Sequence, residues 1–223
     1  MTTAAPQVDR YIAERLLGDD SALEAALAAN EAAGLPAIDV SAPQGAMLGL
    51  LTKLIGARRV LEVGTLGGYS TICLARALPE GGKVVTLEID PRHAEVARSN
   101  LDHAGVSERV EIRVGPALDT LQAMIAAAEG AFDLVFIDAD KESNADYVRA
   151  AIALGRPGTA IIVDNVVRDG RVLDAASKDA MIQGTRRLFD YLHGEVRLDA
   201  TAIQTVGSKG WDGFVIARIK GAA

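Results

Sequence analysis

Oxygen-bearing side chains follow two apolar runs of the sequence, in positions that would suit a bound cation. The run Leu134–Ile137 is followed by Asp138, and the run Ala160–Val163 is followed by Asp164 and Asn165. If the two runs are neighbouring parallel strands, these three side chains converge at one edge of the sheet. An all-oxygen set suits Mg²⁺, Mn²⁺ or Ca²⁺ and does not suit zinc. Three protein ligands would leave coordination positions for a substrate and water.

The segment Asp138–Lys141 has two interpretations when it is taken by itself, because Asp-Ala-Asp-Lys is equally typical of a solvated turn. Two acidic strand ends in consecutive units of the chain favour a site. A histidine-based metal site is not indicated. His93, His103 and His193 lie on separate predicted helices without ligand spacing, and we expect them at the surface.

A glycine-rich segment follows an earlier apolar run and is typical of a turn that lets a ligand approach the backbone. Its glycines are Gly64, Gly67 and Gly68, which is not the G-x-G-x-x-G spacing of a dinucleotide site. Glu62 precedes the turn and would repel a pyrophosphate. The segment therefore favours an adenosine-type cofactor that carries positive charge, although such a turn by itself is equally often a purely structural device.

Glu88 ends the next apolar run, where doubly wound folds place an acid that accepts hydrogen bonds from ribose hydroxyls. A glutamate at a strand end is about as often simply solvated. The glycine turn and Glu88 are nevertheless expected at the carboxyl ends of adjacent strands, and that edge is where such sheets bind ligands. Together they predict a cofactor site.

The elements that must position these residues alternate between short apolar runs and helical stretches, which is typical of a parallel sheet covered on both faces. The predicted strands are Val60–Val63, Val84–Ile89, Val110–Val114, Leu134–Ile137 and Ala160–Val163. The predicted helices between them are Ser70–Leu78, Pro91–Ala104, Ala117–Ala128 and Ala145–Leu154.

The two ends of the chain complete this pattern. Helices over 22–33 and 43–55 are expected before the first strand, and a helix over 178–192 is expected before two strands over 195–202 and 213–219. The fold class is therefore α/β, with a doubly wound, mostly parallel, seven-stranded Rossmann-like sheet, an N-terminal helical cap and a C-terminal antiparallel hairpin. We expect one domain over residues 1–223, made of the cap (1–56) and the core (57–223).

Composition excludes several classes of partner. The chain has 223 residues with 23 Lys and Arg against 30 Asp and Glu, a net charge of −7, so it lacks the basic face that nucleic acid or an anionic membrane would need. Met1 to Arg10 contains neither a basic nor an apolar leader segment, and we expect a cytoplasmic protein. The single cysteine, Cys73, lies in an apolar helical run and is expected to be inert packing.

These residues resemble a known family, the cation-dependent catechol and caffeoyl-coenzyme A type O-methyltransferases, especially its small bacterial members. The resemblance covers nearly the whole chain. It rests on the segments Pro43–Met47, Val60–Thr71, Gly115–Leu118, Phe136–Lys141, Val163–Asn165 and Trp211–Gly213.

The resemblance implies a role for each matching position. S-adenosylmethionine would be bound by Met47, Glu62, Gly64, Ser70, Glu88, Ala117, Asp138, Asp140 and Tyr147. The cation, Mg²⁺ before Mn²⁺ or Ca²⁺, would be held by Asp138, Asp164 and Asn165, and Lys141 would be the general base. For Met47 and Tyr147, core packing on a helix remains an equal alternative. A small phenolic substrate and a homodimer are also implied.

One departure from the family limits the substrate prediction. The catechol branch has a carboxylate shortly before the final Asp-Gly to grip the diol, whereas Thr205–Ser208 has none here. Recognition of a vicinal diol would then depend mainly on the cation. Two other functions stay open at this point: a nucleotide-dependent oxidoreductase, which the glycine spacing disfavours, and a non-catalytic S-adenosylmethionine-binding module.

Overall fold

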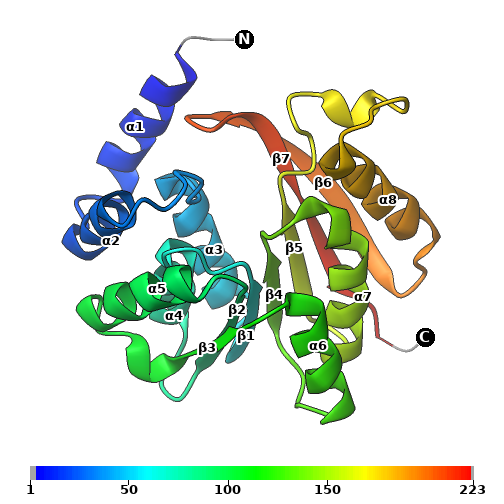
Figure 1. Cartoon of the computed structure of the whole chain (residues 1–223), viewed down its shortest axis with the longest axis horizontal. Coiled ribbons are helices and arrows are strands. Elements are labelled where there is room, and N and C mark those ends of the chain that lie inside the picture. The colour runs from blue at the N-terminus through cyan, green and yellow to red at the C-terminus, as the bar shows by residue number, and fades with distance from the viewer. Residues whose placement is uncertain (1–3, 222–223) are drawn as a thin grey trace. The chain divides into compact units, whose positions relative to one another are not determined.

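The computed structural model describes residues 4–221, and the chain forms two compact units, Met1–Ala117 and Leu118–Ala223. Figure 1 shows the order of helices and strands along the chain. Within residues 4–221, no helix is both long and apolar enough to cross a membrane. The predicted single domain and cytoplasmic location stay predictions.

The first unit begins with three helices and continues into a three-stranded sheet. Its elements are α1 (Ala5–Leu16), α2 (Ser21–Ala32), α3 (Ala42–Leu54), β1 (Arg59–Val63), α4 (Tyr69–Ala77), β2 (Lys83–Glu88), α5 (Pro91–His103), η1 (Ser107–Arg109) and β3 (Val110–Val114). The helices predicted over 22–33 and 43–55 are confirmed as α2 and α3, and α1 is a further helix within the predicted cap, residues 1–56.

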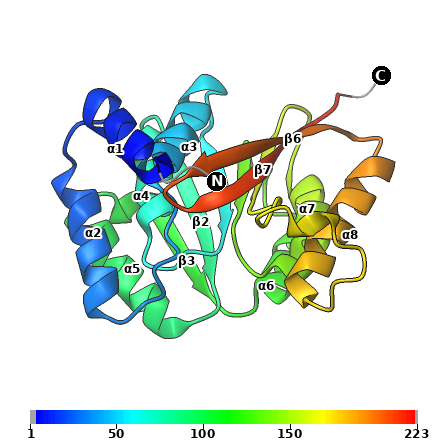
Figure 2. The same ribbon diagram turned by 90° about the horizontal axis from the view of Figure 1, so that it is seen from above.

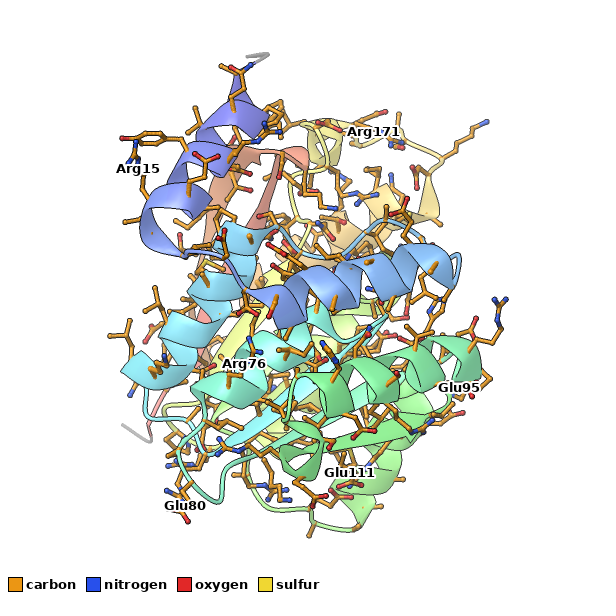
Figure 3. All side chains as sticks on the ribbon, turned by 90° about the vertical axis from the view of Figure 1, so that its left-hand side faces the viewer. Arg15, Arg76, Glu80, Glu95, Glu111 and Arg171 are labelled. Carbon is orange, nitrogen blue, oxygen red and sulfur yellow. The ribbon has the colours of Figure 1, made fainter. Side chains whose placement is uncertain are left out.

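Local sequence explains where the helices of this unit begin. The Asp20 carboxylate accepts from Leu23 N at the start of α2 and also pairs with Arg76 of α4 at 2.6 Å, a residue labelled in Figure 3. Ser41 and Gln44 form a reciprocal capping box at the start of α3. Such caps satisfy the free amides of the first helical turn and fix where each helix begins.

The sheet of the first unit is parallel in the order β3-β2-β1. Val63 at the end of β1 is opposite Leu87 of β2, so the residues after both strands lie at the same edge. Helices α4 and α5 pack on this sheet. Strand side chains such as Val60 and Leu61 are fully buried, which is why the strands contain continuous apolar runs.

The second unit carries the remaining strands. Its elements are α6 (Ala117–Ala126), β4 (Leu134–Ile137), η2 (Lys141–Ser143), α7 (Asn144–Leu154), β5 (Ala160–Asp164), η3 (Arg171–Leu173), α8 (Ala180–Gly194), β6 (Leu198–Gly207) and β7 (Gly210–Ile219). Strands β4 and β5 are parallel, whereas β7 is antiparallel to both β5 and β6. Figure 2 shows β6 and β7 side by side as the predicted hairpin.

The predicted fold class is confirmed: residues 4–221 form an α/β fold with a seven-stranded sheet, in which β7 runs antiparallel to its neighbours β5 and β6. The boundaries of the hairpin were the least accurate part of the prediction. Strand β6 begins at Leu198, not at Glu195, because Glu195 is the residue that caps the end of α8 and its carboxylate binds Arg197 and Tyr191. Both strands are also longer than predicted, since their solvent-facing residues do not follow an apolar pattern.

Candidate cofactor turn and acidic cluster

The glycine turn, residues 64–68, connects β1 to α4 in the first unit. Gly64 and Gly68 have φ of 101° and 86°, a left-handed backbone that favours glycine. Leu66 adopts φ of 50° between them. Gly68 is the residue before the first turn of α4. The turn therefore ends at a helix N-terminus, where free backbone amides can meet a polar ligand.

Glu62 lies beneath this turn with no exposed surface. The Ser70 hydroxyl donates to Glu62 Oε1 at 2.6 Å. The Thr71 and Thr86 hydroxyls donate to Oε2 at 2.5 and 2.7 Å. Thr65 Oγ1 is also 2.6 Å from Thr86 Oγ1. Glu62 thus fixes the start of α4 through hydroxyl groups, and its contact with a cofactor stays a prediction.

Glu88 at the end of β2 also supports the turn. Its Oε2 accepts from the backbone amides of Thr65 at 3.2 Å and Leu66 at 2.7 Å. Its Oε1 accepts from Asp90 N at 3.0 Å and lies 3.5 Å from His93 Nδ1. The solvated alternative for Glu88 is wrong, since the residue is 6% exposed. His93 is half-buried beside it and not a free surface residue.

A polar network that the sequence analysis missed holds the other side of the turn. Asn100 of α5 donates to the Gly67 carbonyl at 2.8 Å and to Asn30 Oδ1 of α2 at 3.0 Å. Asn30 in turn donates to Asp39 Oδ1 at 2.9 Å. Asn30 and Asn100 are 3% and 5% exposed. Their only sequence signal is a polar residue on the buried face of an amphipathic helix.

The remaining predicted cofactor residues of this unit are less closely tied to the turn. Met47 lies on α3 and is half-buried. Ala117 begins α6 and follows Gly115, whose amide donates to the Glu88 carbonyl at 2.8 Å. The loop after β1 carries Gly64 and leads into Ser70, whereas Glu88 ends β2. The Glu88 carbonyl then connects this edge to the segment before Ala117. The role of Met47 stays a prediction.

The acidic cluster of the second unit, which we define as Asp138, Lys141, Asp164 and Asn165, lies at the ends of β4 and β5. Ile137 is opposite Val163 in the parallel pair, so Asp138 and Asp164 follow a matched pair of residues. Neighbouring strands are about 4.8 Å apart, so the two aspartates leave adjacent strand ends. The negative charge of Asp138 acts on Asp164, so the two carboxylates lie close enough to interact.

Lys141 is 4% exposed, and its Nζ donates to Asp138 Oδ1 at 2.7 Å. Asp138 and Lys141 are therefore in direct contact, and their roles as cation ligand and base stay predictions. Helix α8 packs against this turn at Gly184, where a Cβ atom would lie 2.3 Å from the Lys141 carbonyl oxygen. The glycine lets α8 back the segment that carries Lys141.

The electrostatics of the cluster are unbalanced. Burial, reinforced by the negative charge of Asp138, raises the pKa of Asp164 to about 7, although Lys141 and the Asn165 amide oppose the change. Asn165 has φ of 59°, and its amide donates to Asp164 Oδ1 at 2.8 Å. In residues 4–221, no three His, Cys, Asp or Glu side chains form a metal-binding group. A cation here would need the amide oxygen of Asn165 as its third ligand.

Asp140 and Tyr147 also come together in the second unit. The Tyr147 hydroxyl donates to Asp140 Oδ1, and Asp140 Oδ2 accepts from Ser143 N at 3.1 Å at the start of η2. Tyr147 is 4% exposed, and burial together with Asp140 raises its pKa. The packing alternative for Tyr147 therefore fits as well as a cofactor contact, which stays a prediction.

Comparison with known proteins agrees with this arrangement. The family model for O-methyltransferases matches residues 19–218. The catechol O-methyltransferases of Mycobacterium tuberculosis and Niastella koreensis are 58% and 48% identical, and each match covers 96% of both chains. The crystal structure of the Bacillus cereus O-methyltransferase with S-adenosylhomocysteine has a TM-score of 0.97 and 52% identity, covering 99% of this chain and 100% of that one.

A second solved structure, the Streptomyces achromogenes O-methyltransferase of tomaymycin synthesis with S-adenosylmethionine, has a TM-score of 0.95 and 46% identity over 99% of this chain and 100% of that one. The Rossmann-like fold and the resemblance to the catechol and caffeoyl-coenzyme A type enzymes are confirmed. The length of the family match and the identity to its members leave one conclusion: this chain belongs to the O-methyltransferase family.

Proposed function

We propose that the protein transfers the methyl group of S-adenosylmethionine to a hydroxyl of a small catechol-like phenol, with a divalent cation at the acidic cluster. The observation that carries the proposal is that Asp138 and Asp164 follow the paired residues Ile137 and Val163 of β4 and β5. Buried Lys141 is ion-paired to Asp138 beside them. An O-methyltransferase needs a base and a means of activating a hydroxyl, and this cluster offers both.

The cofactor proposal rests on the glycine turn. Its free amides at the start of α4 and the carboxylates of Glu62 and Glu88 make a surrounding that favours a cationic, hydroxyl-rich ligand over a pyrophosphate. The related proteins from Bacillus cereus and Streptomyces achromogenes carry S-adenosylhomocysteine and S-adenosylmethionine in their structures. No observation on this chain favours a nicotinamide cofactor.

The cation proposal rests on the donor set. Asp138, Asp164 and Asn165 would hold the ion, and their oxygens suit Mg²⁺ first, with Mn²⁺ and Ca²⁺ as alternatives. A buried carboxylate with a raised pKa beside a second carboxylate is a place where added positive charge is favourable. When bound, the cation would lower the pKa of a phenol hydroxyl as a Lewis acid.

Lys141 would accept the substrate proton. Its amine is buried and held by the Asp138 carboxylate, so it approaches a substrate at the cluster from a fixed position. In the reaction, the phenol oxygen attacks the methyl carbon, the carbon–sulfur bond breaks, and its electron pair stays on sulfur to give S-adenosylhomocysteine. Nζ in the ion pair with Asp138 is an ammonium group and cannot accept a further proton, so Lys141 would act as the base only as a neutral amine, a form that a cation held by Asp138 would favour. The hydroxyl proton would then move to the neutral Nζ, and positioning of the two reactants would supply much of the acceleration.

One feature of the hairpin limits the substrate class. Thr205–Ser208, where β6 ends, carries no carboxylate to grip a diol. A vicinal diol would then be recognised mainly through the cation. We expect catechols and caffeate to be methylated and monophenols to react far more slowly, which a panel of caffeate, its thioester, catechols and dihydroxyflavonoids would measure.

Two experiments test this function. Lys141→Ala should keep S-adenosylhomocysteine affinity by calorimetry while turnover falls at least about a hundredfold, as expected for loss of a general base. Lys178→Ala, at an exposed lysine, is the matched control and should retain activity. EDTA should abolish turnover and Mg²⁺ restore it. Full turnover in Lys141→Ala would reject the base, and full turnover in chelator would reject the cation.

We further propose a homodimer, with the N-terminal helices as the contact. None of the residues of α1 is buried, and Tyr11 and Leu16 are 61% and 77% exposed. Leu50 and Leu54 of α3 are 60% and 79% exposed, and α3 packs against α1. Clustered exposed apolar side chains favour a protein interface. Light scattering should give a mass twice that of one chain. Leu54→Lys should reduce the measured mass to that of a single chain.

A further inference from the structure

The segment Trp211–Gly213 has no role in the proposed chemistry, yet it contacts the loop that follows Asn165. This loop, residues 165–170, connects β5 to η3 in the second unit. Its backbone is left-handed at Asn165, Arg168 and Asp169, with φ of 59°, 56° and 55°. Residues with side chains rarely adopt this conformation, so three in one loop require support from outside it.

That support comes from three successive residues at the start of β7. Asp212 Oδ1 accepts from Val167 N at 2.9 Å and from Arg168 N at 3.0 Å. On either side, the Gly213 carbonyl accepts from Val166 N at 3.0 Å, and the Trp211 carbonyl accepts from Asp169 N at 2.9 Å. Four consecutive loop amides, at 166–169, are therefore bound by consecutive residues of one strand.

Packing explains the other two residue types of the segment. A Cβ atom at Gly213 would lie 2.3 Å from the Ile203 carbonyl oxygen and 2.9 Å from Val167 Cγ2, so only glycine lets β7 approach the loop. A Cβ atom at Gly170 would lie 2.8 Å from the Trp211 ring, which shows that the indole covers this end of the loop. Trp211 is the only tryptophan of the chain.

We propose that Asp212 is a positioning residue for the cation ligand Asn165, an inference that rests on the proposed function. Asn165 lies between two fixed points. Its own amide donates to Asp164 Oδ1 before it, and the amides held by Asp212 begin two residues after it. The left-handed backbone of Asn165 sets the direction of its side chain, and the Asp212 carboxylate keeps the backbone in that conformation.

The role requires an acceptor oxygen and not a negative charge, which separates it from a direct cation ligand. Asp212→Asn keeps Oδ1 for the two loop amides, whereas Asp212→Ala removes it. Asp199→Ala is the matched control, because Asp199 is an exposed acid of the same hairpin whose carboxylate pairs with Lys220 at 3.3 Å.

The experiment is an Mn²⁺ titration of the full chain, followed by the electron paramagnetic resonance signal of free Mn²⁺, together with Trp211 fluorescence. We expect Asp212→Asn and Asp199→Ala to bind within about twofold of the original chain. We expect Asp212→Ala to bind Mn²⁺ at least about tenfold more weakly. Its Trp211 emission should shift to the red, because the indole becomes more exposed to solvent when the loop no longer packs against it.

The outcomes separate the two levels of the argument. Absence of Mn²⁺ binding by the original chain would overturn the cation proposal itself. Normal Mn²⁺ binding by Asp212→Ala, or equal weakening in Asp212→Asn and Asp212→Ala, would overturn the positioning role alone. If Asp212→Ala does not fold, Asp212→Asn still tests the role, because a tenfold loss of Mn²⁺ affinity in that folded variant would overturn it by showing that the charge and not the acceptor oxygen matters.

Discussion

Replacing Gly67 by alanine should damage the glycine turn, because the new methyl group would collide with the side chain of Asn30. A Cβ atom at this position would lie 1.8 Å from Asn30 Oδ1, 2.3 Å from Cγ and 2.4 Å from Nδ2. The amide of Asn30 must therefore move. It cannot do so without leaving its bonds to Asp39 and Asn100, which are 2.9 and 3.0 Å long.

The cost follows from those two hydrogen bonds. One is between amides, and the other is accepted by the carboxylate of Asp39, so their loss should lower the free energy of unfolding by about 2–4 kcal/mol. For a chain of this length, the melting temperature should then fall by roughly 5–15 °C. Asn30→Ala should cost a similar amount, because it removes the same two hydrogen bonds. It also removes the three atoms that would lie nearest a methyl group at position 67, so the collision is absent from the double variant.

A double-mutant cycle makes the prediction sharp. Once Asn30 is alanine, Gly67→Ala should cost less than about 1 kcal/mol, which leaves a coupling energy of about 2–3 kcal/mol. Urea unfolding of the four proteins measures it, and calorimetry with S-adenosylhomocysteine shows whether the turn still binds. Simple additivity of the two changes would refute the reasoning, since the steric contact would then not be with Asn30.

Three further predictions follow from buried groups. The pKa of Asp164 is raised to about 7 from an unfolded value near 3.8, so its contribution to stability is present at low pH and is lost as pH rises through about 7. Because Mg²⁺ needs the ionised carboxylate, the rise in melting temperature on adding Mg²⁺ should be larger near pH 8 than near pH 5.5, by at least about 5 °C. A smaller rise near pH 8 would contradict the raised pKa. Glu62→Ala should lower the free energy of unfolding by about 2–5 kcal/mol, because it leaves the hydroxyls of Ser70, Thr71 and Thr86 without their acceptor. Glu62→Gln should lower it by only about 1 kcal/mol, because an amide can still bond those hydroxyls. Equal losses of the two variants in urea unfolding would count against the network. Burial raises the pKa of the Cys73 thiol to about 12, so Ellman's reagent near pH 8 should label it at least about a hundredfold more slowly in the folded chain than in concentrated urea, and rapid labelling of the folded chain would show the thiol to be accessible.

The parts of the site that the sequence predicted are those set by short-range rules. Strand ends, the glycine turn and the first residues of α3 and α5 each depend on neighbours in the chain, as when Asp90 caps α5 just before Pro91. The acidic cluster was predictable for a similar reason: parallel strands end at one edge, so Asp138 and Asp164 needed no knowledge of distant contacts.

The supports of those residues were not predictable, because each joins positions that are far apart in the sequence. Asn100 binds Asn30 across 70 residues, and Asp212 binds Val167 across 45. An asparagine inside a helix or an acid at a strand end has many possible partners, and only the folded chain selects one. For the same reason the sequence indicated a ribose ligand for Glu88 and did not show that it binds the turn's own amides.

The two most buried acids of the candidate sites differ in how their charge is accommodated, and this difference argues for a cation at only one of them. Glu62 accepts three hydroxyl hydrogen bonds within 2.7 Å, so the first unit stabilises its carboxylate without any added ion. Asp164 is also buried, at 3% exposed, but the negative charge of Asp138 acts on it and its pKa is raised. At neutral pH the protein alone therefore leaves Asp164 only partly ionised, whereas a divalent cation would favour the ionised form and would bring the amide oxygen of Asn165 into use.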